Sequence, residues 1–195
     1  MRNTLLAAVL VALPFTALGA AEELEIDASH TYPNFTVSHR GLSMLHGRFN
    51  QTSGQVVLDR DGGTSSVKVV VQTTSVDTGH QKRDDHLRSA EFLDVAKHPE
   101  MTYQSTKVTY TGAETARVEG KLTLHGVTKP LALEVTRIFC TQHTVKKTPV
   151  CGFSARGTLK RSDFGITYGI PNVGDDIELR IEAEAQKKDD KPVKG

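Results

Sequence analysis

Strict alternation of apolar and polar residues runs through most of this chain and is clearest in residues 176–185. There Ile177, Leu179 and Ile181 occupy alternate positions, and the positions between them are charged. Successive side chains of a β-strand point to opposite faces, so this pattern predicts a strand with one buried face and one solvated face. Residues 117–124 repeat the pattern. The chain is therefore expected to fold mainly as an antiparallel sheet.

Turn residues separate the remaining alternating segments. Ser53-Gly54 interrupts one of these segments and predicts a bend or bulge that joins two strand halves. Eight or nine antiparallel strands favour a closed barrel, which leaves no unpaired sheet edge, and a two-sheet sandwich is the alternative. The further strands are expected at residues 24–27, 35–39, 48–60, 67–71, 101–110, 129–139 and 150–159.

Residues 75–99 are the one stretch that loses the period of two and gains charge, which predicts a single helix. Asp77 or Thr78 is the expected N-cap. Arg83-Asp84-Asp85 fits the solvated first turn of that helix, where acidic residues favour the helix dipole. A charged catalytic cluster is the alternative interpretation of these three residues.

Both ends of the chain have a biased composition. Residues 1–21 carry one basic residue, a short apolar run and then small residues, which is typical of a signal peptide for export to the periplasm. The run is too short to cross a bilayer. Residues 22–186 are expected to form one barrel domain, and residues 187–195 a disordered charged tail. Without Arg2 the chain carries 23 basic and 23 acidic residues, so its charge gives no reason to expect binding to nucleic acid or to an anionic membrane.

The sequence contains two cysteines, Cys140 and Cys151, separated by a short polar stretch. In an oxidising compartment this spacing predicts a disulfide across a hairpin, with a pair of free thiols as the alternative. A catalytic redox pair is not expected, because the spacing is not C-x-x-C.

Eight histidines occur, but their spacing matches no metal-binding motif, so neither a metal nor a cofactor is expected. We expect His30 and His39 to bond to the backbone or cap the barrel end, with an axial haem ligand as the alternative. Motifs for acyl, phosphoryl and hydride chemistry are absent from the sequence. Aromatic residues make up 6% and tryptophan is absent, which argues against a barrel that spans the outer membrane.

Residues 161–165 (RSDFG) form another unusual stretch. A structural role would have Arg161 bridge to Asp163 or to an acidic residue of the helix, with Phe164 plugging one end of the barrel. The functional alternative places Phe164 at the mouth of a cavity.

Ordered motifs spread over residues 27–184 closely resemble the signature of the YceI family of periplasmic lipocalin-like proteins. They include SVDTG at 75–79, RD at 83–84, HLRS at 86–89, GKLTLHGVTKP at 120–130 and RSDFG at 161–165. The resemblance implies an all-β, extended antiparallel eight-stranded lipocalin-like barrel with one crossover helix. It also implies that the lumen holds a polyisoprenoid or an isoprenoid-tailed quinone. Residues 138–150 depart from the shared pattern.

We therefore expect a binding protein that carries or sequesters a long apolar isoprenoid, and not an enzyme. The alternatives are an enzyme that modifies a lipid, with His30, His39 or His86 as the base, or a haem-binding barrel. The chain could act as a homodimer. The residues expected to contact the ligand are Phe35, Val37, Leu42, Met44, Phe49, Leu87, Phe92, Phe153, Phe164, Ile177, Leu179 and Ile181.

Overall fold

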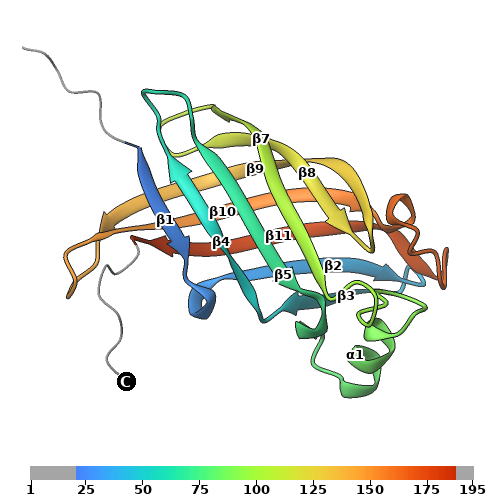
Figure 1. Ribbon diagram of the computed structural model, residues 1–195. Helices are drawn as coiled ribbons and strands as arrows, with labels where there is room; N and C mark the ends of the chain where they lie inside the picture. The colour runs from blue at the N-terminus through green and yellow to red at the C-terminus, as the bar shows by residue number, and fades with distance from the viewer. Residues whose placement is uncertain (1–20, 188–195) are drawn as a thin grey trace, which may run out of the picture.

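The computed structural model describes residues 21–187 and consists of one strongly curved sheet with a short helix at one end (Figure 1). The only α-helix of that range, α1, spans Gln81–Arg88 and lies between β6 and β7. The strands are β1 (Glu22–Ile26), β2 (Tyr32–His39), β3 (Ser43–Phe49), β4 (Thr52–Leu58), β5 (Ser66–Gln72), β6 (Val76–Asp77), β7 (Glu100–Tyr110), β8 (Ala116–Leu124), β9 (Val127–Gln142), β10 (Pro149–Lys160) and β11 (Val173–Gln186).

These eleven segments form eight antiparallel strands, because three strands are each broken once. A 3-10 turn at Ala28–His30 separates β1 from β2, and another at Thr73–Ser75 separates β5 from β6. Residues 50–51 separate β3 from β4. Each strand pairs with its neighbours along the chain, and β11 closes the ring by pairing with β2 and β1. The closed eight-stranded barrel expected from the sequence is confirmed.

The closure of the ring is uneven. Strand β11 pairs with β10 through eleven residue pairs, from Val150–Gln186 to Lys160–Asp176. On its other side it pairs with β2 through seven residue pairs but with β1 through only two. The ladder between β11 and β1 is therefore very short, and hydrogen bonds between Glu184 and the residues Asp27 and Thr31 continue it towards β2.

The bend expected at Ser53-Gly54 lies a few residues earlier, at residues 50–51, so that prediction was wrong in position. Gly54 remains in the ladder and pairs with Val69. Its φ is +152°, and a Cβ there would lie 2.1 Å from the carbonyl oxygen of Lys68. Glycine is needed for this close approach of two backbones and not for a chain reversal.

The helix is much shorter than residues 75–99. Its N-cap is His80, whose ring nitrogen accepts from the backbone N–H of Arg83, so the prediction of Asp77 or Thr78 was wrong. The Asp77 carboxylate does not cap the helix, because it accepts a hydrogen bond from the backbone N–H of Gly79. The positive φ of Gly79, +75°, turns the chain before the helix can begin. After Ser89 the chain continues as turns up to β7.

Arg83 and Asp84 both bind Thr78. The guanidinium of Arg83 donates to the hydroxyl and the carbonyl of Thr78, and the buried carboxylate of Asp84 accepts from its N–H and hydroxyl. The pair therefore fixes the turn that leads into α1. The role is structural, but the expected solvated first turn was wrong for Asp84, which is 6% exposed.

The buried apolar residues form three clusters. We call the end of the barrel that carries α1, the β8–β9 turn and the 3-10 turn Arg161–Phe164 the helix end, and the end that carries the β9–β10 hairpin the hairpin end (Figure 1). The largest cluster reaches the helix end through Phe92, Phe164 and Ile166. A second cluster, formed by Leu24, Val56, Cys151 and Ala185, lies towards the hairpin end.

Cys140 and Cys151 face each other across β9 and β10 and form a disulfide, which confirms that prediction. The expected signal peptide at residues 1–21 and the expected tail at residues 187–195 lie outside the described residues, except for Ala21 and Lys187 at the boundaries. Within residues 21–187, no helix has the length and apolar character needed to cross a membrane.

Candidate ligand cavity

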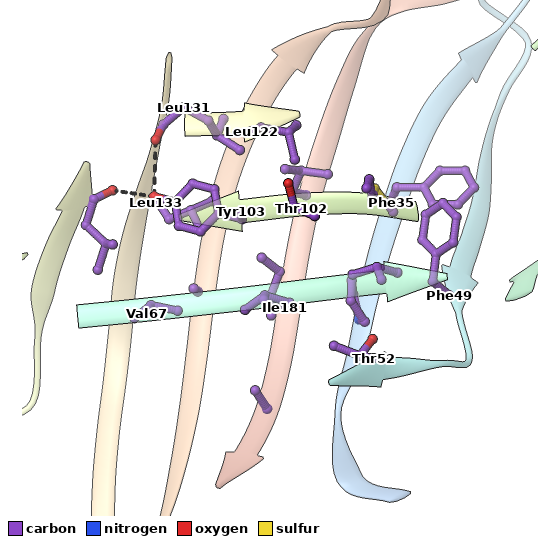
Figure 2. A pocket seen from close by; sticks show the side chains of 18 of the residues that line it. Phe35, Phe49, Thr52, Val67, Thr102, Tyr103, Leu122, Leu131, Leu133 and Ile181 are labelled. Carbon is purple, nitrogen blue, oxygen red and sulfur yellow. Dashed lines mark hydrogen bonds between the residues drawn. The ribbon is translucent and has the colours of Figure 1, made fainter. Parts of the chain in front are cut away.

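The lumen of the barrel contains a cavity of about 290 Å³. Its lining is almost entirely apolar and extends along the barrel, from Leu58 and Tyr110 near the hairpin end to Phe92 and Ile166 at the helix end. Figure 2 shows part of this lining, with side chains that come from strands on opposite sides of the barrel. Such a space suits a long hydrocarbon and offers little to a polar molecule.

Nine of the twelve residues expected to contact a ligand line this cavity. They come from β2, β3, β10, β11, α1 and the loop after α1, segments that are far apart in the sequence. These nine are Phe35, Val37, Phe49, Leu87, Phe92, Phe153, Ile177, Leu179 and Ile181.

The other three residues lie elsewhere. Leu42 is in the turn between β2 and β3 and is 82% exposed. Met44 is 46% exposed and points out of the barrel. Alternate residues of β3 face opposite sides, and Leu45 and Phe49 are on the inward side. Phe164 is buried in the helix-end cluster and is not part of the lining. Its position matches the plug interpretation and not the cavity-mouth interpretation.

Several large side chains of β5, β7, β8 and β9 also line the cavity and were not named from the sequence. The alternation of apolar residues in residues 67–71, 101–110 and 117–124 was a sufficient signal for most of them, because it marks the inward face. They include Val71, Met101, Tyr103, Leu122, Leu131 and Leu133.

Tyr103 brings a hydroxyl to the lining but uses it within the protein. The hydroxyl donates to the carbonyl oxygens of Val118 and Leu131, both at 3.2 Å (Figure 2). Burial raises the pKa of Tyr103 to about 12, and the charge of Glu119 adds to the rise. This group therefore stays protonated and structural at any physiological pH.

Thr52 brings a hydroxyl that has no such partner. It lines the cavity near Phe49 and is 4% exposed, and its Oγ1 makes no hydrogen bond to the residues described (Figure 2). Thr148 is the other described residue with a buried, unbonded side-chain oxygen, and it lies in the β9–β10 hairpin and not in the lining. A buried hydroxyl without a partner costs stability, so Thr52 is the lining position best suited to bind a polar atom of a ligand.

Arg161 holds the helix end shut. Its guanidinium donates to the carbonyl oxygens of Gly174, Ile166 and Val173 at 2.8, 3.0 and 2.9 Å. The expected bridge to Asp163 or to the helix was wrong, because these carbonyls take the donors instead. Burial lowers the pKa of Arg161, and the Asp175 carboxylate acts in the opposite direction. A buried cation satisfied by backbone groups fixes the loop that it binds.

The histidines do not face the lumen, because none of the described histidines lines the cavity. His30 is exposed and lies 3.0 Å from the carboxylate of Asp27, which raises its pKa. The hydroxyl of Ser29, with His30, holds the pKa of Asp27 down at about 2. His86 contacts Glu91 and stacks edge-on against Phe92 and Tyr168. The enzyme and haem alternatives both needed a lumen histidine, so no observation favours them.

Two groups of side chains do have the composition of a metal site. One is Asp94, His98 and His125, and the other is Asp27, His30 and Glu184. Motif spacing could not reveal either group, since each joins distant parts of the chain.

Comparisons with known proteins agree on one family. The family model described as "YceI-like domain" matches residues 24–185. Protein YceI of Salmonella arizonae is 38% identical over 188 residues, which cover 94% of this chain and 97% of the relative.

Two solved structures share the fold. BcnA of Burkholderia cenocepacia superposes with a TM-score of 0.72 at 21% identity, covering 82% of this chain and 98% of that one. A polyisoprenoid-binding domain from Saccharophagus degradans, implicated in plant cell wall breakdown, superposes with a TM-score of 0.62 at 19% identity. That match covers 85% of this chain and 98% of that domain.

Proposed function

Because the chain belongs to the YceI family, we propose that it is a periplasmic binding protein that carries or sequesters a long apolar isoprenoid, a polyisoprenoid or an isoprenoid-tailed quinone, in the barrel lumen. The observation that carries this proposal is the apolar cavity that runs along the barrel. The name of the Saccharophagus degradans domain supports the choice of ligand class.

The physical basis of binding is the removal of hydrocarbon from water. Each Å² of apolar surface buried contributes roughly 25 cal/mol, so a chain of several isoprene units gains affinity along its whole length. The inward side chains of Ile177, Leu179 and Ile181 are only half-buried, since they face the cavity. A ligand would cover this surface together with its own.

Export to the periplasm is supported by the residues themselves. A disulfide such as Cys140–Cys151 persists in an oxidising compartment, and residues 1–21 have the composition of a signal peptide. A binding role without catalysis is supported by the lining, which offers neither a histidine nor a carboxylate among the residues described.

Mass spectrometry of an organic extract tests the proposal directly. The protein is purified from the periplasm of its native cells, and we expect an isoprenoid in about equimolar amount. Ala155, which is buried and lines the cavity, allows a matched test, because Ala155→Phe fills the lumen with a ring. Arg156→Gln, one residue further on the outer face, is the control. The proposal is wrong if native protein yields no isoprenoid, or if Ala155→Phe retains as much as the control does.

A further inference from the structure

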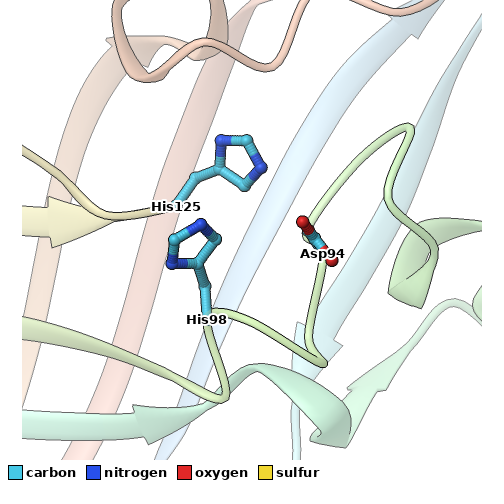
Figure 3. Close-up of side chains that lie close together, drawn as sticks. All are labelled: Asp94, His98 and His125. Atoms are coloured by element: carbon cyan, nitrogen blue, oxygen red, sulfur yellow. The ribbon is translucent and has the colours of Figure 1, made fainter.

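Asp94, His98 and His125 meet at the helix end although they come from two separate segments. Asp94 and His98 lie in the loop between α1 and β7, and His125 lies in the turn between β8 and β9. One ligand atom of each side chain lies within 4.8 Å of the others. Figure 3 shows the three side chains turned toward one another.

The tautomer of His125 is set by the backbone. Its Nδ1 lies 3.1 Å from the carbonyl oxygen of Phe164. A carbonyl only accepts hydrogen bonds, so Nδ1 carries the hydrogen and Nε2 keeps its lone pair. Histidines that bind metals are oriented in this way, with the second ring nitrogen donating to a carbonyl or a carboxylate.

Asp94 supplies the negative charge. The residue is 8% exposed, and Nζ of Lys97 lies 2.8 Å from its Oδ2. An aspartate carboxylate is ionised at neutral pH, so it can bind a cation. The Lys97 side chain is 73% exposed and can turn into solvent when another cation takes its place.

The backbone is shaped for this arrangement. A Cβ on Gly126, whose φ is +75°, would lie 2.8 Å from Cε1 of His98, so glycine leaves room for the ring. Asp94 and His125 themselves have φ of +44° and +51°, and among the described residues only two other non-glycine residues have positive φ. Such conformations cost free energy and are retained where the surroundings require them.

We infer that Asp94, His98 and His125 bind one divalent transition-metal ion of the zinc class. Two imidazoles and one carboxylate are a ligand set typical of zinc, whereas calcium and magnesium prefer oxygen ligands only. The bound ion would join the α1–β7 loop to the β8–β9 turn and leave a coordination position open to water. This site is independent of the lumen and of the ligand proposed for it.

The second group, Asp27, His30 and Glu184, has a simpler explanation. His30 and Glu184 are exposed, and Asp27 caps a 3-10 turn by accepting from the N–H of Ser29. The Nδ1 of His30 is already paired with Asp27 at 3.0 Å. This group therefore serves as the matched control.

Calorimetric titration with ZnCl₂ tests the inference. Full-length exported protein without a histidine tag is treated with a chelator and dialysed. We expect one Zn²⁺ per chain, and with Co²⁺ a visible absorption band from nitrogen and oxygen ligands. His125→Asn suits the positive φ, since asparagine tolerates it. It should lower the Zn²⁺ affinity by about 100-fold or more, at least the effect typical of disturbing a metal's outer shell. His30→Asn should leave the affinity unchanged.

Lys97→Met provides a second variant, on a side chain that is 73% exposed, and its fold is checked by circular dichroism before the titration. It removes the competing cation, so we expect Zn²⁺ to bind at least as tightly as to the unmodified protein. The inference is overturned if no Zn²⁺ binds below millimolar concentration, if His30→Asn abolishes binding while His125→Asn does not, or if Lys97→Met weakens it.

Discussion

Leu24 and Leu179 are both leucines in strands of the same barrel, but they meet different surroundings. Leu24 is 1% exposed and packs with Val56, Cys151 and Ala185 towards the hairpin end. Leu179 is half-buried and faces the cavity. Position in a strand therefore does not by itself decide how well a side chain is packed. The packing depends on which side chains lie opposite it across the barrel.

The difference separates stability from binding. Around Leu24, and around Phe164 at the helix end, close-packed clusters hold the barrel together. Phe92 and Ile166 of the largest cluster also line the cavity, whereas the lining residues Ile177, Leu179 and Ile181 are only half-buried. Substitutions of fully buried cluster residues should reduce the free energy of unfolding, and substitutions of the half-buried lining residues should mainly affect the ligand.

The largest effect expected is from Leu24→Ala. It opens a cavity in a filled cluster and should cost about 2–5 kcal/mol of unfolding free energy. Leu179→Ala only enlarges an existing space and should cost about 1 kcal/mol, because its side chain loses less buried surface. Urea denaturation of the two variants measures both values. Equal losses would mean that the lumen is packed as tightly as the ends.

Arg161→Met tests the closure of the helix end. Three carbonyl oxygens lose their donor, and we expect a loss of about 3 kcal/mol, about 1 kcal/mol for each. Lys160→Met is the control, because its ion pair with Asp176 is exposed and should hardly change the denaturation midpoint. A similar response of both variants would show that the carbonyls find other donors.

Removing the disulfide tests the hairpin end. The Cys140→Ala and Cys151→Ala double variant frees a loop with a sequence separation of 11 residues. In the chain-entropy model this costs about 2–3 kcal/mol. Unmodified protein denatured under reducing conditions should show the same loss, and native protein denatured without reductant should show no free thiol. A larger loss in the variant than in the reduced protein would point to packing around Cys151 instead.

Thr52→Val has the smallest expected effect on stability, less than about 1 kcal/mol, because the hydroxyl that it removes has no partner. Thr73→Val is the matched control, since the Thr73 hydroxyl donates to the carbonyl of His98 at 2.7 Å and its loss should cost about 1 kcal/mol.

Calorimetry of the Thr52→Val variant then compares the binding of two ligands. Thr52→Val should weaken binding of an isoprenoid alcohol and leave a pure isoprenoid hydrocarbon unaffected. Equal binding of both ligands would mean that Thr52 contacts no ligand oxygen.

The barrel was predictable because the period of two survives in its long strands. In residues 176–185 the alternation alone defines β11 and its inward face. The breaks were not predictable in the same way. Gly54 suggested a bend, but the need for glycine there arises from the backbone of β5, a contact that depends on strand register.

The lining residues were predictable where inward and outward side chains alternate along a strand without interruption. The prediction of ligand contact was wrong for Met44, because that residue was assigned to the inward face of its strand. It was wrong for Leu42, because that residue lies in a turn. Asp94, His98 and His125 could not be grouped from the sequence. Only the fold brings the β8–β9 turn against the loop after α1.

The two residue pairs that join β11 to β1 are Glu25–Gln186 and Ile26–Ala185. Asp27 and Thr31 add hydrogen bonds to Glu184 beside these pairs. Amide protons of this short ladder should still exchange with deuterium sooner than those between β10 and β11, where eleven residue pairs open together. This short ladder lies beside Ile26 and Ala183 of the lining, but Ala185 also belongs to the close-packed cluster around Leu24, so opening the barrel there would expose that cluster as well.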